Sequence, residues 1–197
     1  MATAIIGVGN VGGAVARHLV NGGEPVVLAA KEQAKPEALA DELGPLARAA
    51  SVEDAIAAGD AVVFALWLDA LQDVLPRQAH GLEGKVVIDP SNPVGFDASG
   101  QPIRTIPEGQ SQGSIVASLL PAGAHYVKAF GTLAAPSLAS SSNRDPRAVL
   151  FYATDDDEAV ATAERLIRAA GFDPLRAGGL ADAGRIEMPG GDSTSSA

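Results

Sequence analysis

The chain has 197 residues, contains no cysteine, and carries 14 basic against 24 acidic residues, a formal net charge of −10. One domain is expected at this length, and the lack of cysteine excludes a disulfide framework, a thiolate zinc site and a cysteine nucleophile. The acidic balance and the 4% of aromatic residues argue against nucleic-acid binding and against attraction to an anionic membrane. No apolar run of about 18 residues predicts a membrane span, and the N-terminus lacks the cationic region of a signal peptide, so a cytoplasmic protein is expected.

Apolar runs typical of buried strands alternate along the chain with helix-like stretches. The predicted strands are Thr3–Val8, Pro25–Ala29, Pro45–Ala49, Asp60–Leu66, Lys85–Ile88, His125–Phe130, Arg147–Thr154 and Phe172–Arg176. The predicted helices are Val11–Val20, Glu37–Leu43, Val52–Ala57 with Ser51 as its N-cap, Leu68–Arg77, Ser114–Leu120 and Asp156–Ala169. The polar segments Asp97–Gln112 and Ala134–Asp145 are predicted loops. Such alternation favours an α/β fold with a doubly wound, mostly parallel sheet.

The strongest motif is GVGNVG at Gly7–Gly12, between the first predicted strand and the first predicted helix. In a dinucleotide-binding (Rossmann) turn, the first glycine allows a tight turn and the second lets the backbone approach a pyrophosphate. The third lets the helix pack closely on the strand. These roles fall on Gly7, Gly9 and Gly12, and the free N–H groups of the following helix would bind phosphate. A glycine turn that binds no ligand is the alternative.

The end of the second predicted strand indicates which dinucleotide is bound. NAD sites place an acidic residue there, about 20 residues after the glycines, to bind the ribose hydroxyls. Here the strand ends in Ala30 and Lys31, and Lys35 follows one turn later. Two cations would attract the 2′-phosphate of NADP(H), which this sequence therefore favours. The alternative is that both lysines are solvated and that Glu32 binds the ribose.

Two further strand ends carry candidate residues, because open α/β sheets bind ligands beyond the carboxyl ends of their strands. The first is Ala65, Leu66 and Trp67, and the second is the Asp89–Pro93 segment, DPSNP. Trp67 is the only tryptophan of the chain, and ordinary packing at a sheet edge is its alternative role. A plain turn is the alternative for Asn92 and Pro93.

Several other patterns predict structure rather than chemistry. The segment Gly109–Gly113, GQSQG, matches the nucleophile elbow of hydrolases, but no buried strand precedes it and no acidic residue lies between it and His125. His18 is expected on a helix surface, and His125 is expected to be structural. The acidic run Asp155–Glu158 is expected to begin a helix. No metal site is predicted.

Taken in order along the chain, these motifs resemble the family of NADP oxidoreductases that use the deazaflavin coenzyme F420, which is related to the reductase domain of the STEAP metalloreductases. The segments that carry the resemblance are Ile5–Leu19, Val26–Lys35, Phe64–Trp67, Val86–Gly95, Val127–Ala135, Gly171–Leu180 and Arg185–Glu187. The glycine motif is common to many dehydrogenases, whereas the later motifs are more specific to this family. Val8 and Ala30 stand where the family usually has a threonine and a serine, and Gly131 stands where it commonly has a larger polar residue.

The resemblance implies a role for each matching segment. Its pyrophosphate loop corresponds to Val8, Gly9, Asn10 and Val11, between Gly7 and Gly12. Its 2′-phosphate site corresponds to Ala30, Lys31 and Lys35, and its nicotinamide site to Ala65, Leu66 and Trp67. Its deazaflavin pocket would be bordered by Pro90, Asn92 and Pro93 and by the Thr132–Ala135 segment, with Thr132 and Ala135 at its two ends. A homodimer is expected from the family alone.

The predicted function is hydride transfer between NADP(H) and a ring-type acceptor such as coenzyme F420, with a flavin as the other candidate ring. The bound rings would carry out the chemistry, so no side chain is assigned as a general acid or base. An NADPH-dependent reductase of flavin, ferric chelate or a small carbonyl or imine is one alternative, and a dinucleotide-binding module without catalysis is another. The predicted domain covers residues 1–191, with a substrate-side lobe in roughly 91–191 and a disordered tail at 192–197.

Overall fold

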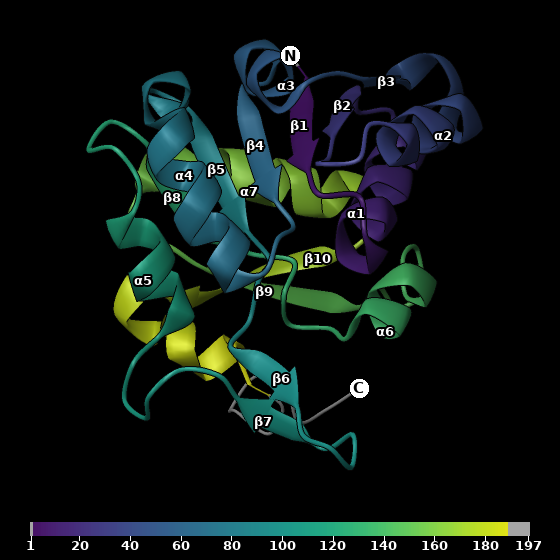
Figure 1. Cartoon of the computed structure of the whole chain (residues 1–197). Coiled ribbons are helices and arrows are strands. Elements are labelled where there is room, and N and C mark those ends of the chain that lie inside the picture. Colours follow the sequence, from purple (N-terminus) through teal and green to yellow (C-terminus); the bar gives the residue numbers. More distant parts are fainter. Residues whose placement is uncertain (1, 189–197) are drawn as a thin grey trace.

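A computed structural model describes residues 2–188 and forms one large sheet with helices on both faces (Figure 1). The strands of this sheet are β1 (Thr3–Ile6), β2 (Val26–Ala29), β3 (Ala47–Ala49), β4 (Ala61–Phe64), β5 (Val86–Asp89), β8 (His125–Lys128), β9 (Val149–Ala153) and β10 (Asp173–Gly178). Their order across the sheet is β10-β9-β8-β5-β4-β1-β2-β3. Each neighbouring pair is parallel except β8 and β9, which are antiparallel. The predicted doubly wound, mostly parallel sheet is therefore confirmed.

Helices connect these strands in the predicted order. They are α1 (Asn10–Asn21), α2 (Ala34–Leu43), α3 (Val52–Ala58), α4 (Leu68–Leu82), α5 (Gln112–Ser118), α6 (Ala135–Ser140) and α7 (Asp157–Ala169), with the short 3-10 helices η1 (Gly44–Leu46) and η2 (Leu180–Ile186). Ser51 caps α3 as predicted, because its side chain accepts a hydrogen bond from the Asp54 N–H over 3.0 Å. No helix among residues 2–188 is both long enough and apolar enough to cross a membrane.

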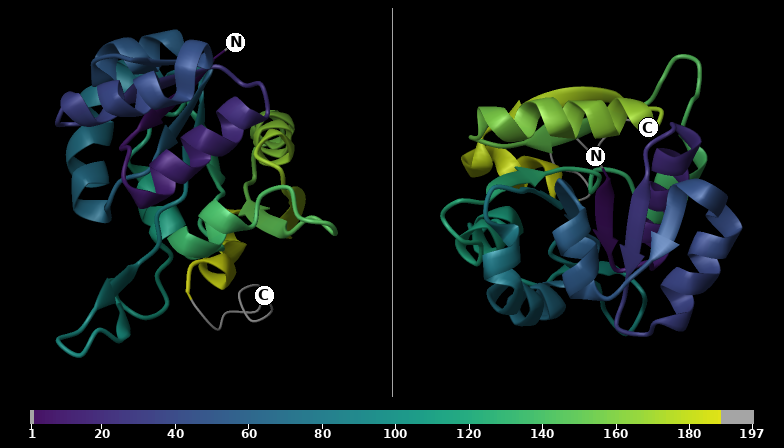
Figure 2. Two further views of the ribbon diagram at one scale, coloured as in Figure 1. Left: turned by 90° about the vertical axis from the view of Figure 1, so that its right-hand side faces the viewer. Right: turned by 90° about the horizontal axis from the view of Figure 1, so that it is seen from above.

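The core consists of two apolar layers, one on each face of the sheet. Alternate strand residues supply them: Ile5 and Val63 face α1, α6 and α7, whereas Ile6 and Phe64 face α3, α4 and α5. Figure 2 shows α7 on one face and α4 on the other. This two-sided burial explains why the strands are continuously apolar in sequence.

Two segments predicted as loops contain regular structure. Within and just before Asp97–Gln112, β6 (Val94–Phe96) and β7 (Pro102–Arg104) form an antiparallel hairpin that projects from the body (Figure 1). Phe96 is 66% exposed, so this hairpin has no buried face and its sequence shows no apolar alternation. The Ser-rich segment contains α6, which is only six residues long and carries too weak a pattern to be recognised.

Most strands of the predicted substrate-side lobe, roughly residues 91–191, belong to the large sheet. Strands β8, β9 and β10 extend the same sheet beyond β5, and η2 then returns to pack on α5. The α4 helix runs to Leu82 rather than ending at Arg77, and it includes Pro76. The predicted tail at 192–197 lies outside the described residues.

Candidate functional site at the carboxyl edge of the sheet

The strand order reverses between β1 and β4, because the chain runs outward from β1 to β3 and then returns to the other side of β1. Open α/β sheets bind ligands at such a reversal, beyond the carboxyl ends of the strands. All the predicted site segments follow the carboxyl ends of β1, β2, β4, β5 and β8, which are parallel neighbours. The topology thus brings them to one edge of the sheet.

The glycine turn after β1 has the geometry that a pyrophosphate site requires. Gly7 has φ = +94°, a backbone conformation that glycine adopts without strain, and its N–H donates to the Ala29 carbonyl over 2.8 Å. A Cβ on Gly12 would collide with the Gly7 carbonyl oxygen, so only glycine allows α1 to approach the turn this closely. A Cβ on Gly9 would meet nothing within 4 Å, which leaves open space at the place where a phosphate would approach.

The first turn of α1 is left free to bind an anion. Its N-cap is Gly9, no side chain caps it, and no acidic residue lies in its first turn. The first helical bond is the one from the Gly13 N–H to the Gly9 carbonyl, so the N–H groups of Asn10, Val11 and Gly12 precede the regular bonding pattern. By contrast, α3 is capped by Ser51 and α7 by Asp156. The positive end of the α1 dipole therefore faces the glycine turn without a competing side chain.

The segment after β2, the neighbour of β1 in the sheet, carries two lysines on the surface. Ala30 is half-buried, whereas Lys31 and Lys35 are exposed. Lys35 Nζ pairs with the Glu32 carboxylate over 3.1 Å, and both side chains are largely in solvent. A bound phosphate would therefore compete with Glu32 for Lys35, and Lys31 is the cation of the two for which no such pair is found among residues 2–188.

The segment after β4 packs directly against the glycine turn. A Cβ on Gly7 would lie 2.5 Å from the Ala65 carbonyl oxygen and 2.8 Å from Leu66 Cδ2. The next residue, Trp67, is the N-cap of α4, and its side chain is 67% exposed. An indole at this exposure contributes little to the core, so the packing role considered from sequence does not account for it.

A side-chain hydrogen bond joins the segments after β5 and β8. Asn92 Nδ2 donates to the Gly131 carbonyl over 2.6 Å, and a Cβ on Gly131 would lie 2.7 Å from the Pro90 carbonyl oxygen. Glycine at this position thus allows the two segments to touch. The side-chain oxygens of Asn92 and Thr132 are buried, and no protein partner is found for either among the described residues.

The predicted residue Ala135 is the first residue of α6, which packs on α1. This contact involves His18, whose Nε2 lies 2.9 Å from the Leu138 carbonyl and whose ring meets Phe172 edge-on at 5.8 Å between centroids. His18 is buried, so the expectation that it lies on a helix surface was wrong. Residues that cover α1 come from α6 and from the far end of the chain, which the helix sequence does not reveal.

A buried polar cluster that no sequence pattern predicted lies beneath the β5 and β8 segments. Asp89, Lys128 and Glu187 are at most 1% exposed, and Lys128 Nζ lies 3.2 Å from Asp89 Oδ2 and 3.9 Å from Glu187 Oε1. Tyr126 donates to Asp89 over 2.9 Å, and burial together with the nearby Asp89 charge raises the pKa of this tyrosine well above 10. Two features of the sequence could have indicated this cluster: Asp89 at a strand end, and the Arg185–Glu187 motif, for which no role was predicted.

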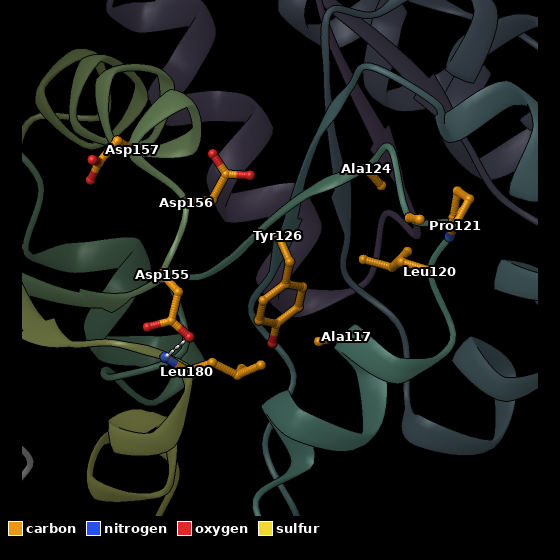
Figure 3. A pocket seen from close by; sticks show the side chains of 10 residues that line it. Ala117, Leu120, Pro121, Ala124, Tyr126, Asp155, Asp156, Asp157 and Leu180 are labelled. Atoms are coloured by element: carbon orange, nitrogen blue, oxygen red, sulfur yellow. Dashed lines mark hydrogen bonds between the residues drawn. The ribbon is translucent and has the colours of Figure 1, made fainter.

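A cavity of about 580 Å³ lies elsewhere, at the opposite end of β8 (Figure 3). Figure 3 shows Asp155, Asp156 and Asp157 on one side and Leu120 with Ala124 on the other. These acids have structural partners: Asp156 caps α7 and lies 2.7 Å from His125 Nδ1, and Asp155 accepts from the Leu180 N–H over 3.1 Å. The acidic run thus begins a helix, as its sequence predicts.

The remaining sequence patterns also have structural roles. Ser111 of the GQSQG segment caps α5 and donates to Glu187 over 2.9 Å, so it does not form a nucleophile elbow. Among residues 2–188, no group of three or more His, Asp or Glu side chains could hold a metal ion. The carboxyl edge of the sheet therefore remains the place where the described residues are arranged for a ligand.

Known proteins resemble this chain. Residues 2–93 match the family described as "NADP oxidoreductase coenzyme F420-dependent". Metalloreductase STEAP3 of Rattus norvegicus is 31% identical over 183 residues, which cover 93% of this chain but only 35% of the metalloreductase. The chain thus spans about a third of that relative.

Two solved structures extend the comparison. The hypothetical protein SMa0349 of Sinorhizobium meliloti is 30% identical, with a TM-score of 0.86, and the alignment covers 100% of this chain and 94% of that one. A reductive aminase of Aspergillus terreus in complex with NADPH is 25% identical, with a TM-score of 0.68 over 94% of this chain and 57% of the aminase. The family match falls on β1 to β5, the half that contains the glycine turn, and the resemblance seen in the sequence is confirmed.

Proposed function

We propose that this protein binds NADP(H) at the carboxyl edge of β1, β2 and β4 and transfers a hydride between it and a second ring. The glycine turn carries this proposal, because Gly7, Gly9 and Gly12 each have the backbone geometry or open space that their role requires. The free N-terminus of α1 supplies N–H groups for the pyrophosphate. When bound, the dinucleotide would supply the hydride chemistry, and the protein would bind and orient it.

Preference for NADP(H) over NAD(H) rests on the segment after β2. An acidic side chain would repel a 2′-phosphate, and the strand end here carries Ala30 and Lys31 instead. Lys31 is exposed and pairs with no acidic residue among residues 2–188, so it can turn toward a phosphate without first losing an ion pair. The reductive aminase that resembles this chain was solved with NADPH, which supports the same choice.

The second ring would lie between Trp67, the Asn92–Pro93 turn and the Thr132–Ala135 segment. Trp67 offers a largely exposed aromatic surface there, and Asn92 and Thr132 supply polar atoms that lack a protein partner among residues 2–188. The family description names coenzyme F420, and a deazaflavin is a ring of the required kind. No side chain is needed as an acid or base, since hydride transfer between two rings depends on their distance and on the exclusion of water.

Fluorescence of Trp67 tests dinucleotide binding directly, because the chain has no other tryptophan. NADPH should quench this fluorescence at lower concentration than NADH, and Lys31→Glu should weaken NADPH binding about tenfold, as expected for a lost charged contact. Equal quenching by NADH and NADPH, or an unchanged affinity in Lys31→Glu, would contradict the 2′-phosphate assignment. Turnover of NADPH with F420, free flavin or ferric chelate then identifies the acceptor.

A second candidate function is the reduction of flavin or ferric chelate, which the resemblance to a metalloreductase favours. The same assay separates the two, since turnover with flavin or ferric chelate but not with F420 would exclude the deazaflavin. NADPH binding without turnover of any acceptor would instead indicate a dinucleotide-binding module. We also propose a homodimer, which sedimentation of the purified chain would test.

A further inference from the structure

The buried cluster of Asp89, Lys128 and Glu187 lies directly beneath the proposed site for the second ring. Asp89 is the last residue of β5 and Lys128 the last residue of β8, so both charges stand at the carboxyl edge. Burying charges is costly unless each one is paired and hydrogen-bonded. Apolar residues would stabilise a core at lower cost, so the cluster calls for another explanation.

Every carboxylate oxygen in the cluster has a donor. Asp89 Oδ1 accepts from the N–H and the hydroxyl of Ser91 over 2.8 and 2.5 Å, and Oδ2 accepts from Tyr126 and Lys128. Glu187 Oε1 accepts from the Ser111 hydroxyl over 2.9 Å and the Gly113 N–H over 2.7 Å. Oε2 of Glu187 accepts from the Gln112 N–H over 2.9 Å. Buried carboxylates that are hydrogen-bonded at both oxygens hold the groups that they contact rigidly.

The network converges on Ser91, the residue before Asn92. Besides its two bonds to Asp89, the Ser91 hydroxyl accepts from Gln112 Nε2 over 2.6 Å, and the Ser91 carbonyl accepts from Lys128 Nζ. Glu187 in turn fixes the first turn of α5, where Gln112 begins the helix. A continuous chain of bonds thus runs from the C-terminal segment, through α5, to the turn at 91–93.

We propose that Gln112 and Glu187 are positioning residues that hold the Ser91–Pro93 turn at the distance that hydride transfer to the second ring requires. Neither residue need touch a ligand, because both act through Ser91. The proposal rests on the proposed function, in which this turn borders the acceptor ring. Displacement of a reacting group by about 1 Å can cost about 100-fold in rate, so a loosened turn would slow transfer while leaving the glycine turn and NADPH binding intact.

Two substitutions test this positioning role. Glu187→Gln keeps the size of the side chain but turns one acceptor into an NH₂ group that faces an N–H donor. Gln112→Met removes the donor to Ser91, and it costs no second side-chain hydrogen bond because Oε1 has no partner among the described residues. Glu164→Gln is the matched control, since Glu164 also accepts hydrogen bonds with both carboxylate oxygens, from Tyr152 and Arg168 over 2.7 Å each, but lies on α7.

With NADPH deuterated at the transferred position, Glu187→Gln should lower kcat about 10- to 100-fold and raise the deuterium isotope effect on kcat, with the NADPH Kd changed less than about twofold. Gln112→Met should lower kcat about tenfold and also raise the isotope effect, and Glu164→Gln should change neither quantity. Lower thermal stability with unchanged kcat and isotope effect in both variants would overturn the proposal and leave the cluster a purely structural role.

Hydrogen–deuterium exchange of the peptide that covers residues 86–96 separates this inference from the proposed function. Exchange there should be faster in Glu187→Gln and Gln112→Met than in the wild type or Glu164→Gln. One outcome is that the wild-type protein turns over none of the acceptors F420, free flavin and ferric chelate while exchange still increases in the two variants. In that case the proposed function has failed, but the coupling to the turn stands. Unchanged exchange in both variants would overturn the coupling whatever the activity.

Discussion

The two halves of the sheet are built by different means. In β1 to β5, buried residues are mainly apolar, and the candidate site is made by backbone: a glycine turn, a free helix N-terminus and strand ends. From β8 onward, the same edge is supported by buried charges, with Lys128 of β8 between Glu187 and Asp89, which ends β5. We infer that backbone geometry forms the proposed pyrophosphate site, whereas a buried polar network sets the position of the proposed second substrate.

The largest expected effect comes from removing the central cation of that network. Lys128→Met should destabilise the fold by about 3–5 kcal/mol, because it leaves two buried carboxylates without their cation. Arg17→Met is the matched control in the first half: its pair with Glu42 over 2.7 Å is roughly half exposed, so about 1 kcal/mol or less is expected. Urea denaturation measures both values, and equal losses would show that the two halves do not differ as described.

Glycine substitutions probe the backbone half. Gly12→Ala should lower the free energy of unfolding by about 1–3 kcal/mol and weaken NADPH binding, because the added Cβ meets the Gly7 carbonyl and pushes α1 away. Gly9→Ala should leave thermal stability unchanged, since its Cβ enters open space, yet should still weaken binding by obstructing the phosphate. If Gly9→Ala binds NADPH as tightly as the wild type does, the pyrophosphate is not bound at this turn.

Alkaline pH should destabilise the second half selectively, because both tyrosines of the chain lie there. Burial and the hydrogen bond to Glu164 raise the pKa of Tyr152 from 10.0 to about 12, and the pKa of Tyr126 is raised too. A folded-state pKa above the unfolded one stabilises the fold at pH below about 10, and this contribution is lost as pH rises toward 12. Phenolate absorbance measures the ionisation of the tyrosines. Ionisation of Tyr152 should lower the free energy of unfolding by about 2 kcal/mol or less, and this loss should be smaller in Tyr152→Phe.

Particular residues show how far the sequence predicts this molecule. The GVGNVG turn, the Ser51 cap and the apolar strands depend on interactions within a few residues or on burial on both faces, so their patterns are visible in one chain. The bonds from Glu187 to Gln112 and Gly113 join residues more than 70 positions apart, and the burial of His18 depends on α6 and Phe172. No local pattern encodes such contacts, and the exposed β6–β7 hairpin has no apolar alternation to reveal it.

The smallest expected effect concerns Lys35, whose role in the backbone half depends on an exposed charge. Glu32 holds Lys35 in an ion pair over 3.1 Å, so Glu32→Gln frees the lysine and removes a negative charge near the proposed 2′-phosphate. NADPH should then bind about two- to fivefold more tightly, which corresponds to the 1 kcal/mol or less of an exposed pair, while NADH affinity stays unchanged. Raising the salt concentration should erase the gain, since both side chains are in solvent. Weaker NADH binding in the same variant would instead identify Glu32 as the residue that binds the ribose, and the preference for NADP(H) would then have to come from Lys31 alone.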